Sequence, residues 1–121
     1  MLYRSNTSTG TAAEDHAARF LEHLGHEVLR RNWRFKKAEI DIISVFKGTL
    51  HITEVKSRSY VFYGEPETSV SINKQNRLID ATYQFIKECQ WEGPLQFDII
   101  SVVFNGKKLP FLLKYFEDAF F

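Results

Sequence analysis

Two β-rich runs stand only two residues apart near the middle of this 121-residue chain. They cover residues 39–46 and 49–57, and Lys47-Gly48 separates them. A two-residue connection suits a tight hairpin and is too short for a crossover, so the two runs should pair as antiparallel strands. This hairpin provides the centre of a sheet against which the rest of the chain must pack.

A helix is predicted before the hairpin. Apolar residues recur at helical spacing over residues 13–24, and Gly25 then provides a natural end. The segment from Thr11 to Glu14 matches a capping box, in which the two side chains satisfy the first free backbone N–H groups. The helix should therefore begin at Thr11 and end before Gly25.

A second helix is predicted after the hairpin, from a cap at Ser71 to about Cys89. Its expected apolar stripe consists of Ile72, Ile79, Tyr83 and Ile86, flanked by Leu78, Ala81 and Phe85. The intervening residues 58–69 contain Gly and Pro and show no period, which is typical of a loop.

Three further strands complete the pattern. Residues 27–33 predict an edge strand with charge on both faces, and residues 96–104 and 109–116 flank an Asn105-Gly106 turn. Pro110 restricts the last strand to an edge. The order of elements requires a crossover by the second helix. We expect an α/β fold with a mixed β-sheet flanked by helices on both faces, formed by one domain at residues 11–121 after a flexible N-terminus at residues 1–10.

Composition narrows the functional classes. A hydrophobic fraction of 44% gives the chain ample apolar area for a core. Cys89 is the only cysteine, which excludes an internal disulfide and a thiolate zinc cluster. The sequence shows neither a signal peptide nor an apolar run long enough to span a membrane, so a cytoplasmic protein is expected. The net charge of +1 gives no long-range attraction to nucleic acid, and any contact must use locally arranged cations.

Asp41, Glu54 and Lys56 form the strongest candidate site in the sequence. Glu54 and Lys56 stand two apart on one strand, so both side chains leave the same face of the sheet. With Lys47 and Gly48 as the turn residues, counting outward places Asp41 opposite Glu54. A bulge at Gly48 would instead leave the two carboxylates diagonal, at a separation that still permits a shared ligand.

The facing carboxylates of Asp41 and Glu54 indicate a bound cation. Like charges opposite each other repel, and the repulsion grows as water is excluded. Mg²⁺ takes oxygen ligands and is commonly held by one or two carboxylates plus substrate phosphate, so we expect Mg²⁺ or Mn²⁺ here. Lys56 would stabilise the transition state and orient the attacking water, or act as base if deprotonated. The site therefore predicts hydrolysis of phosphodiester bonds.

Basic residues gather near the predicted site. Five of the sixteen Lys and Arg residues lie within residues 30–37, and two more lie three apart at the start of the second predicted helix. Phosphate contact is one interpretation, and protection of a strand edge or a solvated helix face is the other. The candidate nucleic-acid-binding residues are Arg31, Arg34, Lys36, Lys37, Lys74 and Arg77.

Asp41 followed by Glu54-Val55-Lys56 resembles the PD-(D/E)xK signature of the restriction-endonuclease-like superfamily, with Ile40 in place of the usual proline. More of the chain resembles one branch, the YraN-type family of small uncharacterised bacterial proteins. The matching positions are Gly10 to Glu14, Gly25, Arg31-Asn32, Glu39-Ile40-Asp41, Glu54-Val55-Lys56, Lys74 and Phe97-Asp98.

This resemblance implies a restriction-endonuclease-like fold and a metal-dependent endonuclease that acts on DNA. It implies that Asp41, Glu54 and Lys56 form the catalytic set, with Glu14 as a further acidic metal ligand. Glu14 alternatively serves only the capping box, which is the favoured interpretation of that residue on its own.

Three positions depart from the pattern of the family and leave the expected metal ligands in place. They are Ala38, Thr53 and Gln96, where a glycine, an aliphatic residue and an arginine are usual. The change at Gln96 removes an expected phosphate contact near Asp98.

Three functions stay open on the sequence alone. The first is a nuclease for branched or single-stranded DNA, and the second is a nucleic-acid-binding module without chemistry. The third is an interaction protein in which the Phe-rich residues 111–121 dock a partner or a second copy in a homodimer, although burial in the core is the favoured interpretation of that segment. The presence of all three residues, Asp41, Glu54 and Lys56, favours the first.

Overall fold

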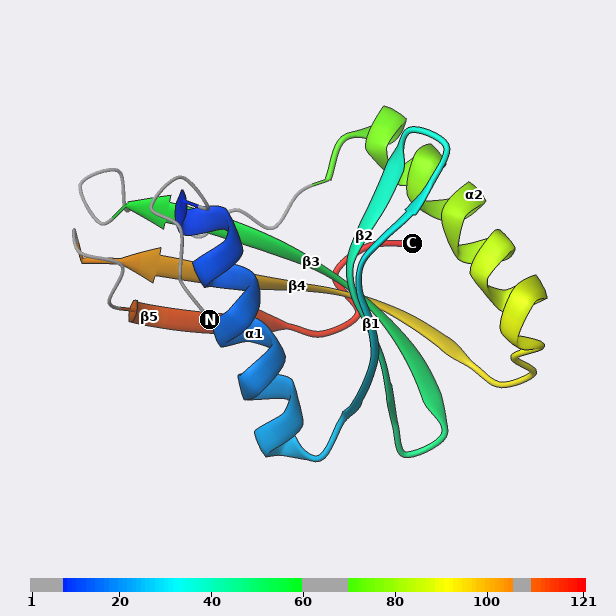
Figure 1. Cartoon of the computed structure of the whole chain (residues 1–121), viewed down its shortest axis with the longest axis horizontal. Helices are drawn as coiled ribbons and strands as arrows, with labels where there is room; N and C mark the ends of the chain where they lie inside the picture. Colours follow the sequence, from blue (N-terminus) through cyan, green and yellow to red (C-terminus); the bar gives the residue numbers. More distant parts are fainter. Residues whose placement is uncertain (1–7, 60–69, 106–109) are drawn as a thin grey trace.

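The computed structural model describes residues 8–59, 70–105 and 110–121, and a five-stranded mixed sheet forms its centre (Figure 1). The elements are α1 (Ser8–Leu24), β1 (Glu27–Phe35), β2 (Ala38–Phe46), β3 (Thr49–Ser59), α2 (Ile72–Cys89), β4 (Leu95–Phe104) and β5 (Pro110–Phe116). The strands follow one another in sequence order across the sheet, with β1 and β5 at the edges. Only β3 and β4 pair in parallel, and α2 makes the crossover between them. The predicted mixed α/β architecture and both edge strands are confirmed.

Each face of the sheet carries its own hydrophobic core. Neighbouring residues of β4 point to opposite faces, so Ile99 packs in the core that contains Leu78 and Phe85 of α2, whereas Ile100 packs with Leu21 of α1. Because both faces are covered, β4 is apolar along most of its length, unlike a strand with one solvated face. Neither α1 nor α2, the helices of the described ranges, is long and apolar enough to cross a membrane.

The central hairpin has the predicted direct register. Phe46 pairs with Thr49, and the two turn residues Lys47 and Gly48 have φ angles of 50° and 80°. Positive φ at both positions matches the twist of the flanking strands, which is why a two-residue turn closes here without a bulge. The pairing of β2 with β3 continues to Ile42 opposite Thr53 and ends there.

The predicted start of the first helix is wrong. Helix α1 begins at Ser8, so Thr11 and Glu14 lie inside it and cannot form its capping box. A capping box is a local pattern, and α1 extends beyond it while Ala12 and Ala13 are buried against the sheet. The remainder of the predicted flexible N-terminus, residues 1–7, lies outside the described residues.

The predicted apolar stripe of α2 is also wrong, although its cap at Ser71 and its end at Cys89 are confirmed. Ile72 and Tyr83 are 68% and 65% exposed. The buried residues of α2 are Leu78, Ala81, Thr82 and Phe85. Two overlapping apolar faces exist on this helix, and its packing over β2 determines which of them is buried. The Asn105-Gly106 turn and most of the predicted loop, residues 60–69, fall outside the described residues, and Arg58 belongs to β3.

Candidate functional site

Asp41 lies where β2 separates from β3. The backbone N–H of Val55 donates to Asp41 Oδ2 at 2.8 Å, and both residues lie just beyond Ile42 and Thr53, the last pair of the two strands. The carboxylate thus accepts a hydrogen bond from a strand N–H at the point where the backbone ladder has ended. This contact fixes Asp41 beside the segment of β3 that carries Glu54 and Lys56.

Glu54 is buried and paired with a cation from α2. Its side chain leaves the face of β3 that packs against α2, and only 4% of the residue is exposed. Lys74 Nζ forms an ion pair with Glu54 Oε2. A buried carboxylate requires such a partner, because burial without compensation strongly disfavours the charged form. For Lys74 the sequence left phosphate contact and a solvated helix face as alternatives, and this contact with Glu54 was not predicted.

The carboxylates of the site disturb one another electrostatically. Burial raises the pKa of Asp41 to about 8, and the negative charge of Glu54 acts in the same direction. Glu14 adds a smaller effect of that sign, whereas the Val55 hydrogen bond and the charge of Lys74 oppose it. The negative charges of Glu54 from β3 and Glu14 from α1 thus both act on Asp41 of β2, and they favour a proton or a cation bound at Asp41.

Glu14 faces this site from α1. Burial raises its pKa, the hydrogen bond from Asn32 opposes that effect, and the charge of Glu39 adds to it. Its position inside the helix removes the predicted capping role. The structure places Glu14 near enough to influence Asp41, which is compatible with its predicted role as a further acidic residue.

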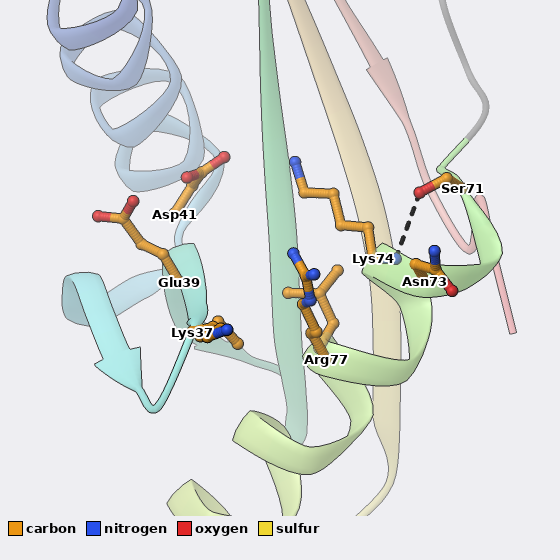
Figure 2. A pocket seen from close by; sticks show the side chains of 9 residues that line it. Lys37, Glu39, Asp41, Ser71, Asn73, Lys74 and Arg77 are labelled. Carbon is orange, nitrogen blue, oxygen red and sulfur yellow. Dashed lines mark hydrogen bonds between the residues drawn. The ribbon is translucent and has the colours of Figure 1, made fainter.

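A pocket of about 500 Å³ opens beside Asp41 (Figure 2). Asp41 and Glu39 contribute from β2, and Lys74 and Arg77 project from the first turns of α2. Lys37 lies at the turn that precedes β2. Three of the predicted nucleic-acid-binding residues, Lys37, Lys74 and Arg77, thus line one pocket with the carboxylate of Asp41. The pocket presents cations beside an acidic centre.

The other three predicted nucleic-acid-binding residues do not line this pocket. Arg31 forms an ion pair with Asp15 of α1 at 2.7 Å, and Arg34 lies 3.7 Å from Glu39. Lys36 Nζ stands 5.3 Å from the centre of the Phe35 ring. Exposed ion pairs of this kind contribute at most about 1 kcal/mol to stability, so neither arginine is essential to the fold.

Lys56 follows Glu54 on the same face of β3 and pairs in register with Ser101 of β4. Ser101 is buried, and its Oγ has no hydrogen-bond partner among the described residues. Nothing in the sequence singled out Ser101, since a lone serine in an apolar strand carries no motif. The parallel register of β3 and β4 is the signal that places it beside Lys56.

The donor set fits a hard divalent cation that brings part of its own shell. Within the described ranges, no three His, Cys, Asp or Glu side chains converge as a complete set of metal ligands. Asp41 and Glu54 offer two carboxylates, and burial together with the charge of Glu54 raises the pKa of Asp41. Mg²⁺ is commonly held by one or two carboxylates, with water and phosphate completing its octahedron. The residues present match that chemistry and do not match zinc, which prefers His and Cys.

A buried polar network occupies the opposite face of the sheet. Asp98 of β4 is fully buried and accepts hydrogen bonds from His51, Gln96, Tyr115 and the backbone N–H of Asp118, all between 2.7 and 2.9 Å. These four donors hold the pKa of Asp98 below its ordinary value against the effect of burial. Gln96 thus donates to Asp98 from the same strand. His51 lies on the face of the sheet opposite Glu54, and the network joins β3, β4 and β5.

His26 extends this network toward β2, and it should make the protein sensitive to acid. Its Nδ1 lies 2.9 Å from Ser44 Oγ, and burial lowers its pKa to about 4. Because the folded state disfavours the protonated ring, its stabilising effect is complete above the ordinary pKa of 6.5 and is lost as the pH falls toward 4. In the parent, the free energy of unfolding should fall by about 2 kcal/mol over this pH range because of His26. His26→Phe keeps a ring stacked on Phe46, and we expect it to remove this pH dependence. Urea unfolding at several pH values measures the slope, and an unchanged slope would contradict the assignment.

Comparison with known proteins identifies relatives of this chain. Residues 13–102 match the uncharacterised protein family UPF0102, a range that includes Asp41, Glu54, Lys56 and Lys74. A UPF0102 protein of Phocaeicola vulgatus is 35% identical over 93% of this chain and 91% of its own length. Others from Flavobacterium psychrophilum and Chloroherpeton thalassium are 38% and 34% identical, over 93% and 97% of this chain and 92% of their own lengths. The predicted resemblance to the YraN-type family is therefore confirmed, and the chain belongs to the UPF0102 family.

Proposed function

We propose that this protein is a cytoplasmic Mg²⁺- or Mn²⁺-dependent nuclease with a restriction-endonuclease-like fold that hydrolyses phosphodiester bonds of DNA. One observation carries the proposal: Asp41 and Glu54 meet at the end of the β2–β3 ladder, where burial and the negative charge of Glu54 raise the pKa of Asp41. Lys56 leaves the same face as Glu54, and a pocket lined by three cations adjoins Asp41. A structural hairpin gains nothing from placing the partly buried carboxylate of Asp41 beside the buried carboxylate of Glu54.

Each residue has a definite task in this proposal. Asp41 and Glu54 hold the cation, and Glu14 orients water or adds a third carboxylate. A bound Mg²⁺ supplies a Lewis acid and lowers the pKa of its water. Lys56 would stabilise the charge that develops on the phosphoryl oxygens. Arg77, which lines the pocket beside Asp41, would hold a neighbouring phosphate, and Lys74 would do so once a cation replaces it at Glu54.

Cleavage of a labelled DNA panel tests the proposal. Single-stranded, duplex, flap and four-way-junction DNA are incubated with Mg²⁺, with Mn²⁺ and with chelator. We expect cleavage only with metal, and a loss of about a hundredfold to a thousandfold in Lys56→Ala, because one charge-stabilising group is removed from the transition state. Lys87→Ala is a suitable control, since Lys87 is exposed in the last turn of α2 and does not line the pocket beside Asp41. No cleavage under any condition would contradict the proposal.

The ion pair between Lys74 and Glu54 favours a second candidate function. Lys74 places a positive charge on one of the carboxylates that would hold a metal. If the Lys74 ammonium group permanently occupies the place of a metal ion, the protein would bind nucleic acid but would not cleave it. Such a module would bind DNA with strong salt dependence, unchanged by chelator and by Asp41→Asn.

A further inference from the structure

A second pocket adjoins the one beside Asp41. It encloses about 290 Å³ and lies between the β1–β2 turn and α2. Its lining consists of Phe35, Lys36, Lys37, Ala38, Arg77 and Asp80. The two pockets share Lys37, Ala38 and Arg77, so together they form one groove that begins at the carboxylates and ends at Phe35.

Two cations stand where the pockets meet. Lys37 comes from the β1–β2 turn and Arg77 from α2, and Figure 2 shows both at the side of the first pocket that lies away from Asp41. A guanidinium and an ammonium group from separate elements can bind one phosphate between them, since each can donate hydrogen bonds to a different phosphate oxygen. The junction of the two pockets is therefore suited to binding a phosphate next to the carboxylates of Asp41 and Glu54.

The far pocket has a different chemistry. The Phe35 ring is partly buried, and Lys36 lies over it. Asp80 places a carboxylate in the same pocket, which disfavours phosphate and accepts hydrogen bonds from the N–H groups of a nucleobase. An aromatic face, a cation and a hydrogen-bond acceptor together fit an unpaired base.

We infer that this groove binds a single-stranded segment of DNA, with a phosphate between Lys37 and Arg77 and an unpaired base against Phe35. The inference rests on the proposed nuclease function and names its substrate class: DNA with a single-stranded stretch next to the cleaved bond. A base within a duplex remains stacked and paired, and only an unpaired base offers its face to an aromatic side chain.

The fold supplies a matched control for this assignment. Lys36 has a φ of 56° and stands 5.3 Å from the Phe35 ring, whereas Lys47 has a φ of 50° and stands 5.2 Å from the Phe46 ring. Both are turn residues, at opposite ends of β2 (Figure 1), and only Lys36 lines the groove. Glycine relieves the positive φ equally at the two positions. A difference in binding between Lys36→Gly and Lys47→Gly therefore reports the groove and not the turn.

The test is the anisotropy of fluorescent oligothymidine in chelator, where cleavage cannot occur. Phe35→Leu keeps an apolar side chain in the core but removes the stacking face, so we expect its Kd to rise about fivefold or more. Phe35→Tyr should bind like the parent. Lys36→Gly should weaken binding and lower its salt dependence, and Lys47→Gly should do neither. Affinity for blunt duplex DNA should change little in Phe35→Leu.

Three results would overturn the inference. The parent protein could fail to bind oligothymidine, or a folded Phe35→Leu could bind it as tightly as the parent. Equal losses in Lys36→Gly and Lys47→Gly would also overturn it, and this comparison holds even if Phe35→Leu does not fold. Failure of the nuclease proposal is distinguishable, because the parent would then bind oligothymidine in chelator and cleave nothing with metal.

Discussion

Asp41→Asn is expected to abolish DNA cleavage and, in the absence of metal, to make the protein more stable. Asn is neutral, and its side-chain oxygen still accepts the hydrogen bond from the Val55 N–H. It therefore keeps the local structure while removing a buried charge beside Glu54. A gain in stability from a change that destroys activity is the mark of a residue kept for function.

The pH dependence of that gain follows from the pKa of Asp41. Its folded-state value, about 8, lies above the ordinary value of 3.8, so the folded state favours the protonated acid. The associated stability is complete below about pH 4 and is lost as the pH rises through 8. The advantage of Asp41→Asn over the parent should thus be small in acid and grow to several kcal/mol above pH 8.

Urea unfolding in chelator, repeated across this pH range, measures the difference. Asp15→Asn provides the control, because Asp15 pairs with Arg31 at the surface and its loss should cost at most about 1 kcal/mol at neutral pH. Added Mg²⁺ should then raise the melting temperature of the parent and leave Asp41→Asn unchanged. A variant that is less stable than the parent at alkaline pH would show that Asp41 is structural.

The sequence predicted the central geometry of this site because the geometry is local. Two turn residues, Lys47 and Gly48, determine the register of the hairpin, and the register brings Asp41 and Glu54 to adjacent positions. Every step of that argument spans fewer than ten residues along each strand. The assignment of metal and catalytic roles to these residues stays a prediction.

The partner of Glu54 was not predictable from spacing. Lys74 reaches it from α2, twenty positions further along the chain and beyond the segment at residues 60–69. The rotation of α2 decides this contact, and the same rotation exposes Tyr83 and buries Phe85. A helix with two overlapping apolar faces does not specify its own rotation, since only packing over β2 selects one face.

Asp98 shows the same limit in another form. One of its four donors is the backbone N–H of Asp118, which follows β5. The others come from β3, β4 and β5, which meet only in the folded sheet. Local sequence patterns therefore predict strand β4 but cannot predict the hydrogen-bond network around Asp98.

Loss of this network should produce the largest destabilisation in the protein. Asp98→Ala leaves His51, Gln96, Tyr115 and the Asp118 N–H without their common acceptor in a fully buried position, and we expect a loss of about 3–5 kcal/mol. Asp98→Asn keeps an oxygen acceptor but loses the charge, so its cost should be smaller. Urea unfolding at neutral pH measures both variants against the parent.

Acid should reduce the difference between Asp98→Asn and the parent. The pKa of Asp98 lies below its ordinary value of 3.8, so its charge contributes stability above that value, which is lost as the pH falls through the folded-state pKa. Because Asp98 and Glu54 lie on opposite faces of the sheet, Asp98→Asn should retain the stabilisation by Mg²⁺ that Asp41→Asn loses. Loss of that metal response in Asp98→Asn would mean that the two faces are coupled through β3 and β4.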